Sequence, residues 1–498
     1  MPGSRLAAAI GHAAVTAALL APLCAFAAPT RDTEAQHLLD RLAFGPRPGD
    51  VQQVEAMGAD AYIAQQLDPD SIPLPADLQQ QLGALDTLNL SPTAVFEKYG
   101  PAPHSRGEKP SKDEKKAERQ RAREVAEQAM DARLLRDIES PRQLQEVMVN
   151  FWFDHFNVYA GKGLDALWLG AYERDAIRPY ALGRFHDLLF ATAKSPAMLF
   201  YLDNWLNSAP GSDRGGKRFA GINENYAREL MELHTLGVDG GYTQADVTTL
   251  AHILTGWGLC PRQGRRADPG GFCFDPRRHD DGEQVFLGQK LHGGEDEVRQ
   301  AITLLADSPA TAKHVTYQLA QYFVSDTPPQ SLLNELMLRW NDTDGDISAV
   351  LQTLFQSPEF RSAQYTGNKF KTPYEFVVSA VRAEGTPVDN LRPLLGELRT
   401  LGMPLYGCLT PDGYKNTQAA WLNPDALMLR LSFAMALGHG DVRLEPDAPP
   451  GQTPEQETTA LYATLSGLFT PQQIAVIDGK PQGLQPGLIL GSPQFMYR

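Results

Sequence analysis

The sequence predicts a mainly α-helical protein, built as a single large and irregular multi-helical domain with one small β-hairpin region. Apolar residues recur with a period near 3.6 in most segments, as in PYALGRFHDLLFATA and YEFVVSAVRAEG, which is the spacing of a helix with one buried face. The pair Ser-Pro precedes several of these segments, and proline is favoured in the first turn of a helix. Alternating strand patterns are scarce, and residues 271–287 are the best candidate for the hairpin.

The first 28 residues are expected to form a secretory signal peptide. Arg5 supplies a positive charge, residues 7–21 are apolar or small, and residues 25–27 (AFA) match a cleavage site. The apolar run is too short for a membrane span, and no later stretch approaches about 20 consecutive apolar residues. We therefore expect a periplasmic or secreted protein that does not cross the membrane.

The rest of the chain is expected to divide into two parts. Residues 29–440 would form the helical domain, and residues 441–498 a Pro-rich linker, one helix and an extended tail. Inside the domain, residues 105–124 (SRGEKPSKDEKKAERQRARE) are almost wholly charged. Such a run is typical of a solvated loop that enters an exposed helix, and a docking surface is the alternative.

Charge and known motifs exclude several classes of protein. The formal net charge of −15 argues against nucleic acid as a partner, since nucleic acid is bound by basic faces. The sequence contains no P-loop, no G-x-S-x-G, no H-E-x-x-H and no G-x-G-x-x-G after a strand. These absences remove the commonest nucleotide-binding, serine-hydrolase and zinc-protease interpretations.

Three cysteines remain after the signal peptide, namely Cys260, Cys273 and Cys408. In an oxidising compartment, Cys260 and Cys273 are expected to form a disulfide that closes the loop between them. Cys408 would then be free and buried. A zinc site is not indicated, because the three cysteines lack any C-x-x-C spacing.

Residues 221–257 (GINENYARELMELHTLGVDGGYTQADVTTLAHILTGW) are the densest stretch of polar groups that could perform chemistry. One helix is predicted to end at Gly237, and a second to begin at Thr243 with Asp246 in an acidic variant of the capping box. The side chains of interest here are Asn223, Glu224, Asn225, Arg228, Glu229, Glu232 and His234.

The spacing of these residues limits the sites they could build. Asn225, Glu229 and Glu232 lie on one face of an ideal helix, whereas His234 lies on another. A straight helix therefore cannot direct Glu232 and His234 to one metal ion. Two interpretations stay open, which are a solvated face with an Arg228–Glu232 ion pair and a covered face whose carboxylates need partners.

His155 follows Leu144, Met148 and Phe151 on the apolar face of another predicted helix. It is therefore expected to be mostly buried. One interpretation is a core histidine that hydrogen-bonds to a carbonyl group. The other places His155 in a pocket, within hydrogen-bonding reach of a carboxylate or amide from residues 221–234, where it would have the shifted pKa that acid–base chemistry needs.

Ten segments carry a family resemblance: HLLDRLAFGPRPGDV, FWFDHFNV, YALGRFHDLL, MLFYLDN, GINENYARELMELHTLGVDGGYTQADV, LTGW, FCFDPRRHD, KFKTPYEFVVSAVRA, TPDGY and WLNP. Through them, residues 37–433 closely resemble the bacterial family called domain of unknown function 1800. The resemblance implies an exported and mostly helical protein, often encoded beside an exported sulfatase-like protein. It implies no reaction.

The chain departs from the family pattern at two places. Where relatives carry Trp-His-Asn-His-Phe, residues 152–156 read WFDHF, so His155 is the only imidazole left in this motif. Where relatives have Ala-Arg before Leu-Thr-Gly-Trp, this chain has Ala251-His252. The second difference weakens any assignment of His252 as an essential group.

Two functions follow as hypotheses. The first is an exported enzyme that acts on a polar cell-envelope or extracellular substrate by acid–base hydrolysis or elimination. Its residues would be His155 or His234 as acid or base, Glu229 as the orienting carboxylate, Asn223, Asn225 and Arg228 as substrate-binding donors, and His279 and Trp257 as pocket lining. The second is a non-catalytic partner or assembly factor for an exported sulfatase-like protein. Side chains around an open cavity favour the enzyme, and sealed side chains favour the partner. The sequence specifies no metal and no cofactor.

Overall fold

The computed structural model describes residues 31–103, 109–212, 221–260, 269–445 and 454–498. Helices account for 59 % of the residues, and the strands in the described ranges form two small two-stranded sheets. The prediction of a mainly α protein is therefore confirmed. None of the described helices is long and apolar enough to span a bilayer. The expected signal peptide, residues 1–28, lies outside the described residues.

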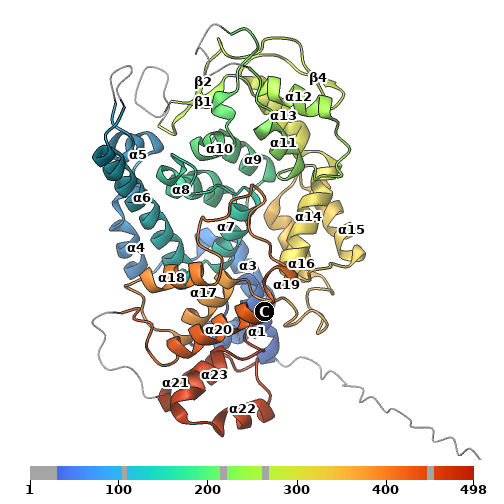
Figure 1. Ribbon diagram of the computed structural model, residues 1–498. Helices are drawn as coiled ribbons and strands as arrows, with labels where there is room; N and C mark the ends of the chain where they lie inside the picture. Colours follow the sequence, from blue (N-terminus) through green and yellow to red (C-terminus); the bar gives the residue numbers. More distant parts are fainter. Residues whose placement is uncertain (1–30, 104–108, 213–220, 261–268, 446–453) are drawn as a thin grey trace, which may run out of the picture.

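Helix α7 (Gln143–His155) lies near the centre of the molecule, with other helices around it (Figure 1). Eleven of its 13 residues are buried, so its polar side chains need partners from neighbouring elements. Arg178 lies 2.7 Å from Glu146, and Arg133 donates to Asn150 at 2.5 Å. Two polar side chains of the central helix, Glu146 and Asn150, therefore bind arginines from other parts of the chain.

Of the five N-terminal helices, the first and the third contact α7. The first helix buries Leu38, Leu39 and Leu42. The chain then turns away at Gly45, whose φ of 85° is a conformation that favours glycine. The helices of this part are α1 (Arg31–Leu42), α2 (Asp50–Met57), α3 (Ala59–Leu67), α4 (Ala76–Gly83) and α5 (Pro92–Tyr99).

Helix α6 (Lys112–Glu139) begins at a capping box, in which the Ser111 hydroxyl accepts from the Glu114 N–H and the Glu114 carboxylate accepts from the Ser111 N–H. Its first part belongs to the charged segment and is mostly exposed. From Val125 onward the helix is largely buried, and it contacts α8 (Leu169–Ala171) and α17 (Pro373–Glu384). Residues 105–108 of the charged segment lie outside the described residues.

The upper part of Figure 1 contains the stretch 221–257 and the strands. Its helices are α9 (Phe185–Lys194), α10 (Pro196–Tyr201), α11 (Asn225–Glu232), α12 (Gln244–Ile253) and α13 (Asp296–Ala306). Strand β1 (Trp257–Leu259) pairs antiparallel with β2 (Phe272–Phe274), and β3 (Val285–Phe286) pairs with β4 (Gln289–Lys290). Residues 271–287 were expected to form one hairpin. They contain β2 and β3, but these strands do not pair with each other, because β2 pairs with β1 and β3 with β4.

Cys260 and Cys273 form a disulfide next to the β1–β2 pair, with their Cα atoms 5.5 Å apart. The Cys260 N–H donates to the Gly271 carbonyl at 2.9 Å, which brings the two cysteines alongside each other. Cys408 is free and buried. The predicted disulfide is thus confirmed, while residues 261–268 of the closed loop lie outside the described residues.

A second group of helices packs beside α7 on the other side of the molecule (Figure 1). It consists of α14 (Pro309–Phe323), α15 (Gln330–Asp342) and α16 (Ile347–Gln356). Helix α14 contacts both α15 and α16. The buried side of α16 is apolar and includes Val350, Leu351 and Leu354, as its helical period predicts.

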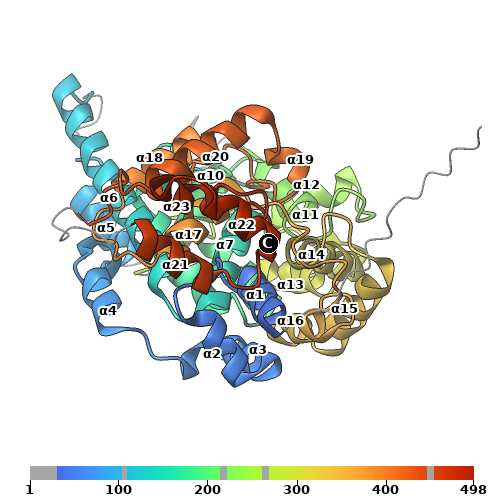
Figure 2. The same cartoon turned by 90° about the horizontal axis from the view of Figure 1, so that it is seen from below.

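The C-terminal segment differs from the expected linker, single helix and extended tail. After α18 (Arg392–Thr400), α19 (Gln418–Trp421) and α20 (Pro424–Leu437), the chain forms α21 (Pro454–Thr464), α22 (Pro471–Asp478) and α23 (Gln485–Leu490). Figure 2 shows α21 close to α17 and α23 close to α20, and the helices of each pair are in contact. The last residue, Arg498, exchanges two backbone hydrogen bonds with Lys369. Burial of Ile489, Leu490 and Phe495 explains why this end folds back onto the domain.

Candidate functional site

Two asparagine side chains hold the start of helix α11, which carries most of the predicted site residues. Asn223 accepts a hydrogen bond from the Asn225 backbone N–H at 3.0 Å and donates to the Asp203 carbonyl at 3.3 Å. Asn225 donates to the Leu202 carbonyl at 3.1 Å. The amide groups of both residues therefore bind the backbone of the turn after α10, which attaches α11 to the rest of the fold.

Arg228 joins α11 to α12. Its guanidinium lies 3.2 Å from Glu224 and 3.5 Å from Glu232, and it donates to the Gln244 side chain at 2.9 Å. Glu224 also accepts from the Thr248 hydroxyl at 2.8 Å. The expected Arg228–Glu232 pair is present. These side chains are partly exposed, so each ion pair contributes at most about 1 kcal/mol.

Glu229 differs from its neighbours because its half-buried carboxylate has no hydrogen-bond or ion-pair partner among the described residues. Burial raises the pKa of Glu229, and the negative charges of Glu232 and Asp412 raise it further. Asp412 shows the opposite shift. Although burial opposes the change, hydrogen bonds from Lys415 and Thr410 lower its pKa. Two nearby carboxyl groups with opposite pKa shifts can serve as a general acid and a general base.

His155 and His234 lie together, one at the end of α7 and the other just after α11. Their ring centroids are 6.0 Å apart, and the Nε2 atom of His155 lies 3.1 Å from the backbone oxygen of His234. The two residues are only 7 % and 1 % exposed. Burial, with a contribution from His314, lowers the pKa of His155 to about 3, and burial also holds the pKa of His234 well below its usual value. Both rings are therefore uncharged at neutral pH.

Two residues that sequence reasoning missed complete this histidine cluster. The amide of Gln318 lies 2.8 Å from Nδ1 of His155 and 3.2 Å from Nε2 of His314. His314 also lies 3.1 Å from the Leu233 carbonyl oxygen through Nε2. Both missed residues sit on one face of α14, four positions apart. That spacing is visible in TAKHVTYQLAQ, but no local pattern connects it to α7.

The histidine cluster is closed to a substrate on the side of His155 and His234. Neither ring nitrogen of His234 makes a hydrogen bond of good geometry among the described residues, although the Pro411 backbone is close enough to affect its pKa. Gly237 packs so closely that a Cβ there would lie 2.9 Å from Nδ1 of His314. A general base must reach the proton that it removes, and neither buried ring is placed to do so.

His279 and Trp257 belong to a different cluster. Nδ1 of His279 lies 2.9 Å from the Thr255 carbonyl oxygen, and its Nε2 lies 3.6 Å from Glu297, with both side chains fully buried. Trp257 is 2 % exposed and packs edge-on against Phe272. In the described part of the chain, no hydrogen bond, ion pair or ring contact joins His279 or Trp257 to His155, His234 or Glu229. The structure therefore does not bring the predicted pocket-lining residues to the predicted acid–base residues.

The described residues contain no group of three His, Cys, Asp or Glu side chains that converges on a possible metal position. Glu232 is 27 % exposed, whereas His234 is almost fully buried. This difference agrees with the expectation that a straight helix directs the two side chains to different sides.

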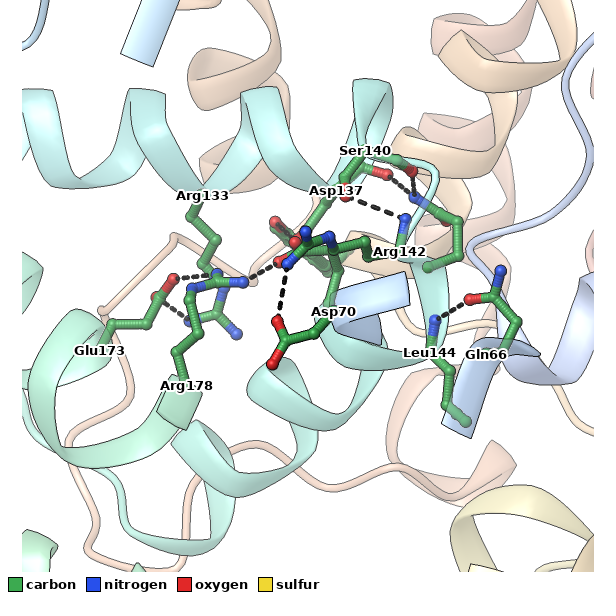
Figure 3. A network of polar contacts seen from close by, with 12 residues as sticks. Gln66, Asp70, Arg133, Asp137, Ser140, Arg142, Leu144, Glu173 and Arg178 are labelled. Carbon is green, nitrogen blue, oxygen red and sulfur yellow. Dashed lines mark hydrogen bonds and ion pairs between the residues drawn. The ribbon is translucent and has the colours of Figure 1, made fainter. Parts of the chain in front are cut away.

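A third polar cluster, which sequence analysis did not predict, lies between α6, α7 and η4, a π-helical turn at Tyr172–Ile177 (Figure 3). Glu173 lies 3.1 Å from Arg178 and 3.7 Å from Arg133, and it accepts from the Tyr406 hydroxyl at 2.9 Å. Against the effect of burial, the two arginines lower the pKa of Glu173. Nearby, Asp137 accepts a hydrogen bond from the Tyr374 hydroxyl. Burial and the charge of Glu146 raise the pKa of Asp137 well above its usual range.

The comparisons with known proteins give one match. The model of a family described as "Protein of unknown function (DUF1800)" matches residues 37–497. No curated protein and no solved structure matches the chain.

Proposed function

Because the chain belongs to the DUF1800 family of proteins of unknown function, we propose its role from the site, as a non-catalytic partner or assembly factor for an exported sulfatase-like protein. One observation carries this proposal. His155 and His234, the histidines that the sequence predicted as acid or base, are buried, and His155 binds the His234 backbone. Side chains enclosed in this way hold helices together.

The other polar residues of the stretch 221–257 support the same role. Asn223 and Asn225 bind backbone carbonyl groups, and Arg228 joins α11 to α12. Each of these groups satisfies a partner inside the fold. These contacts of the motif N-E-x-x-A-R-E-L-x-E-L-H hold α11 against the turn after α10 and against α12.

A partner needs a surface, and α19–α20 supplies a candidate. Met428 and Leu429 are 63 % and 37 % exposed, and Leu422 just before α20 is 38 % exposed. Phe433 and Leu437 of α20 are buried. On an ideal helix Met428 lies opposite Leu437, and Leu429 lies at the border of the buried side. Exposed apolar side chains that lie close together are typical of a protein-binding surface.

Co-purification tests this proposal. The full chain would be co-expressed with an exported sulfatase-like protein of the kind that the family resemblance implies, and the two would be captured through a tag on either one. We expect a complex with the wild type and loss of most of it with the double variant M428D/L429D. L338D changes a residue that is 66 % exposed on α15, and it should bind like the wild type. Failure of the wild type to form a complex would contradict the proposed function.

The carboxyl pair Glu229 and Asp412 favours a second candidate, an acid–base enzyme for a polar cell-envelope or extracellular substrate. Its support is the opposite direction of the two pKa shifts. Protonated Glu229 would donate a proton, and ionised Asp412 would accept one. With cell-envelope preparations as substrate, E229Q and D412N should each lower turnover by about 10²-fold or more, whereas E335Q on the exposed side of α15 should not. Unchanged turnover in E229Q would exclude this role for Glu229.

A further inference from the structure

A cavity of about 300 Å³ lies between α4, α6, α8 and the turn at Tyr406. Part of its wall is apolar, made by Leu82, Leu88, Ala129 and Ala132. The rest of the wall includes Glu173 of the π-helical turn η4, and such turns occur often at functional sites. Neither the histidine cluster nor the α20 surface contributes to this cavity.

Arg136 is a cation on the cavity wall that has no partner. Its side chain is partly buried, yet its guanidinium makes no hydrogen bond or ion pair with any described residue. Arg174 on the same wall is different, because it pairs with Asp175 and donates to the Leu88 and Leu90 carbonyl oxygens. Burial and the charge of Arg178 lower the pKa of Arg136, so an anion in the cavity would stabilise its charged form.

The charges beside the cavity do not balance. Apart from the Arg174–Asp175 ion pair, the ionised groups that meet there are Arg133, Arg136 and Arg178 on the positive side and Glu146 and Glu173 on the negative side. The neighbouring Asp137 does not supply the missing charge, since burial and Glu146 favour its uncharged form. One positive charge is therefore left over, and it belongs to the arginine that faces the cavity.

The base of the cavity is held in place by Tyr406. Its hydroxyl donates to Glu173 at 2.9 Å, and the two side chains are almost fully buried. Its backbone has a φ of 55°, which is unusual for a residue other than glycine. Strained backbone of this kind is found mainly where the surrounding structure holds a functional position.

We propose that this cavity binds a small organic carboxylate, with Arg136 pairing with the carboxylate group and the apolar wall covering the hydrocarbon part. A single surplus positive charge matches a monocarboxylate, and the planar guanidinium can donate two parallel hydrogen bonds to it. The volume accommodates on the order of ten non-hydrogen atoms, judged from the roughly 30 Å³ that a water molecule occupies in the liquid.

Calorimetric titration of the full chain with sodium benzoate tests the proposal. Benzamide and benzylamine have nearly the same size but are neutral and cationic, and inorganic phosphate is an anion without an apolar part. We expect benzoate to bind at least tenfold more tightly than each of the other three. R136Q should weaken benzoate binding by tenfold or more, and R136K, which keeps the charge but not the paired donors, should weaken it less. R123Q changes an exposed arginine of the same helix and should bind like the wild type.

A second variant keeps the test decisive if R136Q does not fold. Gly83 also lines the cavity, and a Cβ added there would meet nothing within 4 Å, so G83L should fill part of the space while every charge stays in place. Loss of benzoate binding in folded G83L supports the proposal. Any of three results overturns it: no benzoate binding by the wild type, equal binding of benzamide or phosphate, or full binding by folded R136Q or G83L.

Discussion

Nε2 of His155 lies 3.1 Å from the backbone oxygen of His234, and this contact joins the central helix α7 to the end of α11. Because a carbonyl oxygen only accepts hydrogen bonds, Nε2 carries the single proton of the neutral ring. The other nitrogen, Nδ1, lies 2.8 Å from the side-chain amide of Gln318. When this amide is rotated by half a turn, its NH₂ group faces Nδ1 and donates a hydrogen bond to it. His155 is therefore fully bonded in its uncharged form.

Acid should destabilise the protein through His155. Its pKa is about 3 in the folded state against 6.5 for a free histidine, so between these values the unfolded chain binds more protons than the folded one. Stability should be constant above pH 6.5 and fall as the pH drops toward 3, by roughly 2 kcal/mol at pH 5 for this residue. Denaturant titrations at pH 7.5, 6 and 5 measure the effect. In H155Q the free energy of unfolding should depend less steeply on pH, because about one proton fewer is taken up on unfolding. An unchanged dependence would contradict the assignment.

Replacing Glu173 should strongly destabilise the fold. Glu173 is 4 % exposed and balances the buried Arg133 and Arg178. In E173Q the buried Arg133 loses its ion-pair partner, while Arg178 keeps only Glu146. Leaving a buried charge without its partner typically costs about 3–5 kcal/mol. The matched control is E127Q, because Glu127 forms an exposed pair with Arg123 on the same face of α6 and should change stability by less than about 0.5 kcal/mol. Urea unfolding measures the loss of stability in each variant. Equal losses in E173Q and E127Q would show that burial of the carboxylate does not determine its contribution.

Replacing Glu229 should leave stability unchanged or raise it slightly. The pKa of Glu229 is raised by burial and by Glu232 and Asp412, so the folded state favours its protonated form, and that stabilisation is lost as the pH rises through the folded pKa. At pH 7 the charge therefore opposes folding, and E229Q should stabilise by up to about 0.5 kcal/mol. At pH 4, where wild-type Glu229 is more protonated, the gain should shrink. A loss of several kcal/mol at pH 7 would instead mean that Glu229 neutralises a buried cation.

The disulfide should stabilise the β1–β2 region. Cys260 and Cys273 are 13 positions apart, and closing a loop of this length contributes up to about 3 kcal/mol in the chain-entropy model. Peptide mapping without reductant should show the linked pair and a free Cys408. The double variant C260S/C273S should unfold at a lower urea concentration. C408S should leave the linked pair intact, and two free thiols at positions 260 and 273 would disprove the bond.

Predictions that depended on a short pattern agreed best with the structure. The capping box at Thr243 and Asp246 is present with both of its hydrogen bonds, and Arg228 pairs with Glu232 four residues away. Burial of His155 followed from its apolar neighbours on the same helix face. The helices of the C-terminal segment were harder to predict from the sequence. Helices α22 and α23 are only 8 and 6 residues long and contain too few turns for a helical period to stand out.

By itself, the sequence determined that the protein is helical, where several helices begin and that Cys260 pairs with Cys273, because helical period, capping and loop closure depend on residues close together in the chain. Only the tertiary structure decided which polar groups from distant parts of the chain meet. It placed Gln318 against His155, Tyr406 against Glu173 and Asp412 near Glu229, pairs that are 163, 233 and 183 residues apart in the numbering. It also separated His279 from His155. A carboxylate or imidazole becomes reactive or structural according to its burial and its partners, and packing between distant segments sets both.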